Sequence, residues 1–154
     1  MKILLLSVGK KHDPALAEAI DDFTGRIGRY APVEWKFISP VENGVGSIDA
    51  ESKSILAALS DSGRDHVVLL DEKGKALTSP GLAQFLEKRL NEGTHRLVFI
   101  IGGAFGVNES VRSRADMVLK ISDFVFPHQL VRLILAEQVY RAFTITRGEK
   151  YHHQ

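Results

Sequence analysis

Residues 99–106 read FIIGGAFG: an apolar run followed at once by a loop with glycine at three of its five positions. Glycines directly after a strand are typical of a backbone that passes close to a ligand, often a nucleotide. The dinucleotide fingerprint G-x-G-x-x-G does not fit, because a motif that ended at Gly106 would need glycine where Ile101 stands. No lysine or arginine follows closely, so a phosphate-binding loop is not indicated. Two interpretations stay open: a tight connection between elements, and a backbone wall for a ligand that is bound through its base or sugar.

Short apolar runs alternate with amphipathic helical patterns on both sides of this loop. The patterns predict strands over residues 3–6, 33–37, 67–70, 97–101 and 117–121, with a turn at 72–74. They predict helices from Asp13-Pro14 to about 28, over 48–59, from Ser79-Pro80 to about 90, from about 108, and from Pro127 to about 143. Apolar strands that alternate with helices predict an α/β fold, in which a mostly parallel sheet carries helices on both faces.

The 154-residue chain is 44% hydrophobic and 25% charged, and we expect residues 1–154 to form a single domain. No apolar run is long enough to span a membrane, and the opening MKILLLSVGKKHD is expected to be a first strand and not a signal peptide. The absence of cysteine excludes thiolate metal sites and is compatible with a cytoplasmic location. The six histidines lack metal-ligand spacing, so no metal site is expected. The net charge of +1 predicts no strong basic surface for naked RNA.

Ligands of parallel α/β sheets bind at the carboxyl ends of the strands, so the segments at those ends are candidate site residues. They are residues 70–71, 102–106 and 122–126. The last of these leads into Pro127 and a helix on which His128 and Arg132 lie four residues apart, hence on one face. Such a pair suits a phosphate-bearing substrate, although an exposed histidine and a surface arginine at a helix start explain it as well.

The polar tail GEKYHHQ, residues 148–154, also has two interpretations. A frayed terminus is the simpler one. An aromatic ring next to basic groups is also what stacks on an unpaired RNA base.

Taken together, these segments resemble one family. The segments that carry the resemblance are IGGAFG after a strand, ISDFVFPHQLVRLILAEQVYRAFTI at 121–145, a closing YHH, the opening MKILLLSVGK, and VVLLDEKGKALTS at 67–79. With them the chain resembles the ribosomal large-subunit RNA methyltransferase H family over essentially its whole length. The resemblance implies a SPOUT-type fold whose C-terminal part, approximately residues 97–154, forms a trefoil knot. It also implies a homodimer that uses S-adenosylmethionine to methylate N3 of a pseudouridine in 23S rRNA, with the assembled ribosome as the expected substrate.

The resemblance also implies the roles of individual residues. Cofactor contacts would fall at Leu70, Gly102, Ile121, Ser122, Asp123, Phe124, Val125 and Phe126. The substrate and the chemistry would be served by His128, Arg132, Tyr151 and His152, with the tail reaching the partner's cofactor. His128 or His152 would act as general base, Arg132 would stabilise an oxyanion or hold a phosphate, and Tyr151 would flank the extruded base. Some members end in YHR where this chain ends in YHHQ, which leaves the role of His153 open.

Three other functions remain as alternatives. A SPOUT methyltransferase of another RNA, such as tRNA, would share the same motifs. A non-enzymatic, ribosome-associated RNA binder would keep the fold without binding the methyl donor. A flavodoxin-like nucleotide-binding module is weakened by the missing phosphate loop.

Overall fold

Five strands and five helices alternate along the part of the chain that the computed structural model describes, residues 1–42, 46–59 and 63–153. The strands are β1 (Lys2–Val8), β2 (Val33–Ile38), β3 (Asp65–Ala76), β4 (Arg96–Ile101) and β5 (Met117–Lys120). The helices are α1 (Pro14–Ile27), α2 (Ser47–Ala57), α3 (Ser79–Asn91), α4 (Glu109–Arg114) and α5 (His128–Thr146). The predicted α/β alternation is confirmed.

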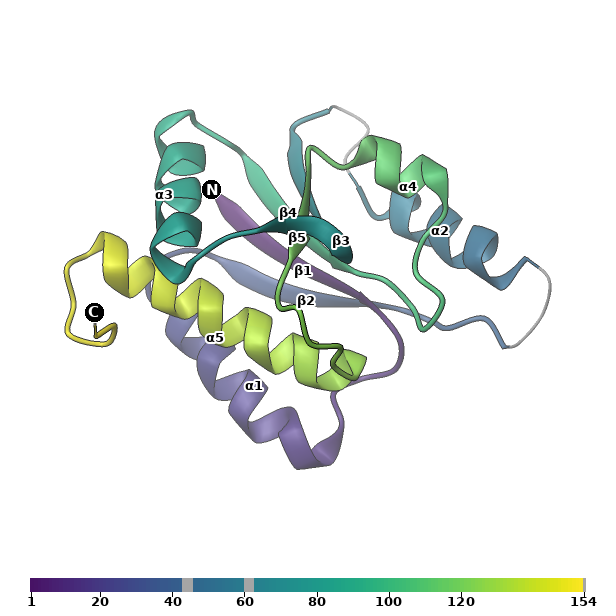
Figure 1. The fold of residues 1–154 in the computed structure, drawn as a ribbon, viewed down its shortest axis with the longest axis horizontal. Coiled ribbons are helices and arrows are strands. Elements are labelled where there is room, and N and C mark those ends of the chain that lie inside the picture. The colour runs from purple at the N-terminus through teal and green to yellow at the C-terminus, as the bar shows by residue number, and fades with distance from the viewer. Residues whose placement is uncertain (43–45, 60–62, 154) are drawn as a thin grey trace.

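All five strands belong to one sheet with the order β2-β1-β4-β3-β5, and each neighbouring pair is parallel. Because the strands are parallel, their carboxyl ends meet along one edge of the sheet. The loops that follow β1, β4 and β5 therefore lie at that edge (Figure 1), together with residues 70–73 of β3.

Helices cover both faces of the sheet, as the apolar strands predicted. Figure 1 shows α1, α3 and α5 on one face and α2 and α4 on the other. Alternate side chains of β1 enter the two cores, since successive residues of a strand point to opposite faces. Ile3 and Leu5 pack with α1, α3 and α5, whereas Leu4 and Leu6 pack in the cluster that contains residues of α2 and α4.

The helix starts follow from short polar caps. The Asp13 side chain accepts a hydrogen bond from the Ala15 N–H, and Pro14 occupies the first turn of α1. Asn108 caps α4 in the same way through the Val111 N–H. At α3 the cap is Thr78, one residue before the expected Ser79, and its hydroxyl accepts from the Gly81 N–H.

The predicted turn at 72–74 is wrong, because β3 continues through it to Ala76. β5 pairs with β3 on both sides of an irregularity between Leu70 and Lys75. Leu70 and Lys75 both lie opposite Leu119, and Ala76 lies opposite Lys120. The two backbones touch there. A Cβ placed on Gly74 would lie 2.6 Å from the carbonyl carbon of Leu119, so only glycine allows this approach.

Candidate functional site

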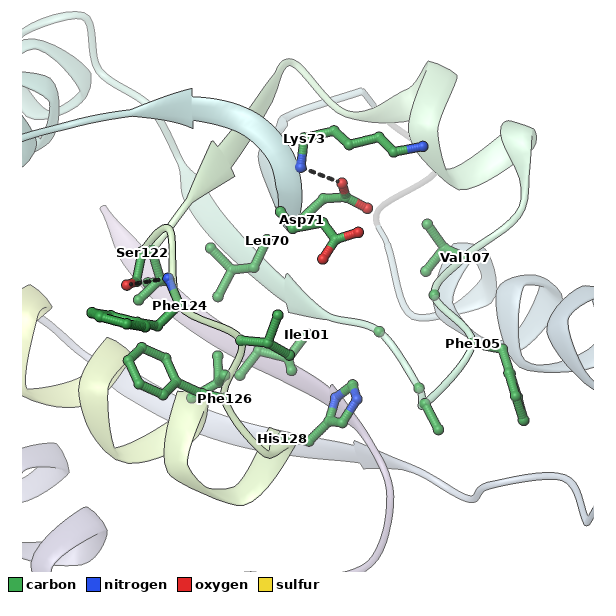
Figure 2. A pocket seen from close by; sticks show the side chains of 18 of the residues that line it. Leu70, Asp71, Lys73, Ile101, Phe105, Val107, Ser122, Phe124, Phe126 and His128 are labelled. Atoms are coloured by element: carbon green, nitrogen blue, oxygen red, sulfur yellow. Dashed lines mark hydrogen bonds between the residues drawn. The ribbon is translucent and has the colours of Figure 1, made fainter.

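A cavity of about 480 Å³ lies at the carboxyl ends of β3, β4 and β5, and we call it the main cavity (Figure 2). Its volume is within the range of small-molecule sites. Three segments form its walls: residues 70–73 after the inner half of β3, the glycine loop 101–107, and residues 121–126 with the start of α5. These are the three strand-end segments that the sequence pointed to.

The glycine loop is both a tight turn and a wall of the main cavity. The Gly106 N–H donates to the Gly103 carbonyl at 3.0 Å, and Gly106 has a φ of 81°, which favours glycine. A Cβ on Gly102 would lie 3.0 Å from Cγ1 of Val107, so a side chain there would push the turn apart. The loop is therefore a tight connection that also lines a cavity, and binding of a ligand there through its base or sugar stays a prediction.

Residues 121–126 form the opposite wall. The Phe124 N–H donates to the Ser122 hydroxyl at 2.9 Å, which closes a small turn (Figure 2). Phe124 and Val125 are 81% and 84% exposed, so two large apolar side chains face solvent at the mouth of the cavity. Asp123 differs from its neighbours: it pairs with Lys120 at 2.6 Å, its side chain is 91% exposed, and it does not line the cavity.

Seven of the eight expected cofactor-contact residues thus line the main cavity. They are Leu70, Gly102, Ile121, Ser122, Phe124, Val125 and Phe126.

Two carboxylates line the main cavity, the exposed Glu72 and the half-buried Asp71. Asp71 is held by other groups of the protein. Its Oδ2 is 2.8 Å from the Arg112 guanidinium, and its Oδ1 accepts from the Lys73 N–H at 2.8 Å. Burial raises the pKa of Asp71, but the hydrogen bonds from Arg112 and Lys73 outweigh this effect and hold the pKa below its usual value. The group is therefore an ionised acceptor that suits hydroxyl or ammonium groups. The sequence did not single out Arg112, which carries no motif.

His128 stands at the base of the main cavity, as the first residue of α5 (Figure 2). Its Nδ1 is buried and has no hydrogen-bond partner within the described residues. This nitrogen is closed off from solvent and is an unsatisfied polar atom inside the protein, whereas the residue as a whole lines the cavity.

A second cavity of about 390 Å³, the side cavity, lies at the carboxyl ends of β1 and β2, on the other side of the glycine loop. It shares Gly103, Ala104, Phe105 and His128 with the main cavity. Its remaining walls come from the β1 end, residues 40–42, α2 and the start of α5, and include Glu51, Gln129 and Arg132. The two cavities are therefore separated by one loop and one imidazole.

Arg132 is only 1% exposed and is bound by groups of the protein itself. Its guanidinium donates to the Ser7 hydroxyl at 3.0 Å, the Lys10 carbonyl at 2.9 Å and the Gln129 side-chain oxygen at 3.3 Å. Burial lowers the pKa of Arg132. No carboxylate forms an ion pair with it within the described ranges. Arg132 thus anchors the loop after β1 to α5 and borders only the side cavity.

Tyr151 and His152 lie away from both cavities of their own chain. The Tyr151 hydroxyl donates to Glu137 at 3.1 Å, and His152 Nδ1 is 3.3 Å from the Arg141 guanidinium. Arg141 lies thirteen residues beyond His128 on α5, which is about 20 Å along the helix axis. The C-terminus accordingly lies beyond the end of α5 that is remote from the cavities (Figure 1). The four expected catalytic residues are therefore not gathered within one chain.

No helix in residues 1–42, 46–59 and 63–153 is long and apolar enough to cross a membrane. The same residues contain no group of three or more histidine and carboxylate side chains placed to hold a metal ion.

Fold and site define a parallel α/β protein with a backbone-walled ligand cavity at the carboxyl edge of its sheet. The family model described as Predicted SPOUT methyltransferase matches residues 1–152. Proteins named ribosomal RNA large subunit methyltransferase H are similar to this chain over essentially their full lengths. The protein of this name from Geobacter metallireducens is 44% identical, with 99% of each chain covered. The one from Cytophaga hutchinsonii is 41% identical, with 99% of this chain and 100% of the relative covered. The chain belongs to the SPOUT methyltransferase family, and its resemblance to the large-subunit methyltransferase H group is confirmed.

Solved structures share the fold at low sequence identity. The tRNA (m1G37) methyltransferase from Aquifex aeolicus is 17% identical and matches with a TM-score of 0.57, covering 100% of this chain and 76% of that one. A probable methylase family protein from Haemophilus influenzae is 10% identical, with a TM-score of 0.56 and coverage of 99% and 70%. These matches concern the fold alone.

Proposed function

We propose that the protein transfers a methyl group from S-adenosylmethionine to N3 of a pseudouridine in 23S rRNA, acting as a cytoplasmic homodimer on the assembled ribosome. The observation that carries this proposal is the main cavity, whose walls contain seven of the eight residues at which the family resemblance implies donor contacts. The names of the full-length relatives support ribosomal RNA as the substrate.

The main cavity fits the proposed donor chemically. Leu70, Ile121 and Phe126 supply an apolar lining for an adenine ring, and the backbone of the glycine loop allows close approach. The ionised Asp71 suits the hydroxyl and ammonium groups that the donor carries. When bound, S-adenosylmethionine supplies an electrophilic methyl group attached to a positively charged sulfur.

His128 is the general base of the proposed reaction. The imide nitrogen N3 is a poor nucleophile while it keeps its proton, so the enzyme must remove that proton as the methyl group is acquired. The imidazole of His128 accepts it. His128 borders both cavities, so donor and acceptor can meet beside it.

The partner's tail completes the site in this proposal. Tyr151 and His152 are held by Glu137 and Arg141, about 14 Å and about 20 Å from His128 along α5, so they serve a main cavity only if a second copy presents them. There Tyr151 flanks the extruded base and His152 stands close to its N3.

We also infer that the C-terminal part, residues 97–154, is threaded as a trefoil knot. β5 lies at the sheet edge beyond β3, yet α5 packs between α1 and α3 beneath the sheet. β5 itself touches the outer part of β3 at Gly74, so the chain that leaves β5 must pass this segment to reach α5. Threading through the β3–α3 connection satisfies these positions.

A methyl-transfer assay tests the proposed function. With labelled donor and ribosomes that lack the modification, the wild-type protein is expected to label pseudouridine at N3, and His128→Ala to lower kcat by about 10²- to 10⁴-fold, the usual contribution of a general base. His95→Ala, an exposed histidine that lines neither cavity, is the matched control and should keep full activity.

The other outcomes separate the alternatives. Label on tRNA and none on ribosomes would make the protein a methyltransferase of another RNA. A chain that binds ribosomes but shows no calorimetric signal with the donor would be an RNA binder. Full activity of His128→Ala would remove this residue from the mechanism.

A further inference from the structure

Glu51 places a carboxylate in the side cavity directly behind the glycine loop. It lies on α2, and its Oε1 accepts from the Val41 N–H at 3.0 Å, which fixes the side chain. A Cβ placed on Gly103 would be 2.6 Å from Oε2 of Glu51, so the absence of a side chain at Gly103 leaves room for the carboxylate. Within the described residues Oε2 takes part in no hydrogen bond of its own, so it is an acceptor available to a ligand.

Glu51 can contact a ligand that also reaches the main cavity, because it lies beside a residue that borders both cavities. Gly103 and His128 border both cavities. A flat ring in the side cavity can therefore direct one edge past His128 toward the main cavity and another edge toward Glu51. The volume of about 390 Å³ admits a ring of this size.

Uridine and pseudouridine differ at one edge of such a ring. N1, N3 and C5 alternate around the six-membered ring, so their substituents point in three evenly spaced directions. If N3 faces the methyl donor and the bond to ribose points toward the RNA backbone, the two nucleosides differ in the group that points in the third direction. Pseudouridine, joined to ribose through C5, presents N1–H there. Uridine, joined through N1, presents C5–H, and the two carbonyl groups keep their places on either side of N3.

Resting on the function proposed above, we propose that the side cavity receives the target base and that Glu51 selects pseudouridine over uridine by accepting a hydrogen bond from N1–H. A half-buried carboxylate that faces C5–H would lose its water without gaining a partner, and this loss disfavours uridine.

The other polar groups of the side cavity are less suited to this role. The Gln129 oxygen already accepts from the Asp13 N–H and from Arg132, and the Arg132 guanidinium donates and cannot accept. Glu42 is exposed at the rim, where water competes for its oxygens. Glu51 is the carboxylate of this cavity that is both half-buried and held in place.

The substitution Glu51→Gln tests the proposal while leaving the shape of the cavity nearly unchanged. The amide oxygen can still accept from Val41, and the amide nitrogen then stands where Oε2 stood and presents a donor to N1–H. kcat/KM for methyl transfer is measured on ribosomes with pseudouridine at the target position and on ribosomes with uridine there, prepared from a strain that lacks the pseudouridine synthase. In Glu51→Gln the preference for pseudouridine is expected to fall by about 10- to 100-fold, which one hydrogen bond to a charged group accounts for.

Glu87→Gln is the matched control, because it removes the same charge from an exposed position on α3 that lines neither cavity, and it should keep the wild-type preference. Calorimetric affinity for the methyl donor should be the same in all three proteins. An unchanged pseudouridine preference in Glu51→Gln, or a wild-type enzyme that methylates both ribosomes equally, would overturn the role of Glu51. A wild-type protein that methylates neither ribosome would instead overturn the proposed function.

Discussion

Arg132 holds together segments that are more than a hundred residues apart. Its guanidinium binds Ser7 and Lys10 at the end of β1, and its Nη2 leaves no space for a Cβ at Gly9, which would lie 2.9 Å away. Gly9 also has a φ of 124°, so both its backbone conformation and the nearby guanidinium favour glycine at this position. This buried cation keeps the loop after β1 against α5 and so maintains the wall of the side cavity.

His12 shares this cluster and makes stability depend on pH. Burial, and then the charge of Arg132, lower the pKa of His12 below its ordinary value of 6.5. The unfolded chain therefore binds a proton more readily than the folded protein, so this contribution to the free energy of unfolding is complete above pH 6.5 and is lost as the pH falls toward the folded-state pKa. In urea unfolding between about pH 7.5 and about pH 5.5, His12→Gln is expected to lose less stability than the wild type.

His153→Gln is the control for this measurement, since His153 is exposed at the tail and its replacement should leave the pH dependence as it is. His66 also has a pKa lowered by burial, so part of the acid destabilisation should remain in His12→Gln. An identical pH dependence in His12→Gln and wild type would show that His12 contributes none of it.

At the level of elements, the contact between β3 and β5 positions the wall formed by residues 121–126. Gly74→Ala would place a methyl group within 2.6–2.8 Å of backbone atoms of Leu119 and Lys120, and backbone cannot move aside as a flexible side chain can. We expect the free energy of unfolding to fall by about 1–3 kcal/mol and the donor affinity to fall with it, because β5 leads directly into that wall. Urea unfolding and calorimetry measure the two effects.

Gly25→Ala is the contrasting variant at this scale. Gly25 lies in α1 with no heavy atom within 4 Å of an added Cβ, so alanine should stabilise the protein by about 0.5–1 kcal/mol and leave donor binding alone. If Gly74→Ala behaved like Gly25→Ala, the β3–β5 contact would not position the wall.

The strands and helices also show which parts of the fold and of the site can be predicted from the sequence alone. Apolar runs and helix caps predict each strand and helix of the described residues, and the strand ends predict the position of the main cavity. The end of β3, with the sequence DEKGKA, has no apolar pattern and returns to β5 at Lys75 and Ala76 after an irregularity, so the sequence alone predicts a turn there. Glu51 was missed because its nearness to Gly103 arises only from the packing of α2 beside the glycine loop. Asp123 shares its backbone segment with true lining residues, and only the turn at Ser122 directs it outward.

At the scale of the whole molecule, the separation of His128 from the tail predicts complementation between inactive chains. A His128→Ala chain keeps its tail, and a chain deleted after Gly148 keeps His128. Each homodimer is expected to be inactive, whereas co-expression in equal amounts should restore about a quarter of the wild-type activity, because half of the dimers are mixed and each mixed dimer has one complete site. Methyl transfer by the purified co-expressed protein provides the measurement.

Failure of the co-expressed chains to regain activity, with mixed dimers verified by differently tagged subunits, would place the tail's action in its own chain. Equal activity of the tail-deleted homodimer and the wild type would remove the tail from the reaction altogether.

The thin partition between the two cavities has a consequence for redesign. A single stretch of main chain, Gly103 to Phe105, borders both, and Gly103 has no room for a side chain beside Glu51. A substitution in residues 103–105 that enlarges or narrows one cavity therefore also changes the other. Under the role proposed for the side cavity, retargeting to another nucleobase with the proposed donor site unchanged therefore requires substitutions on the outer side, on α2 and after the end of β2, with residues 121–126 kept.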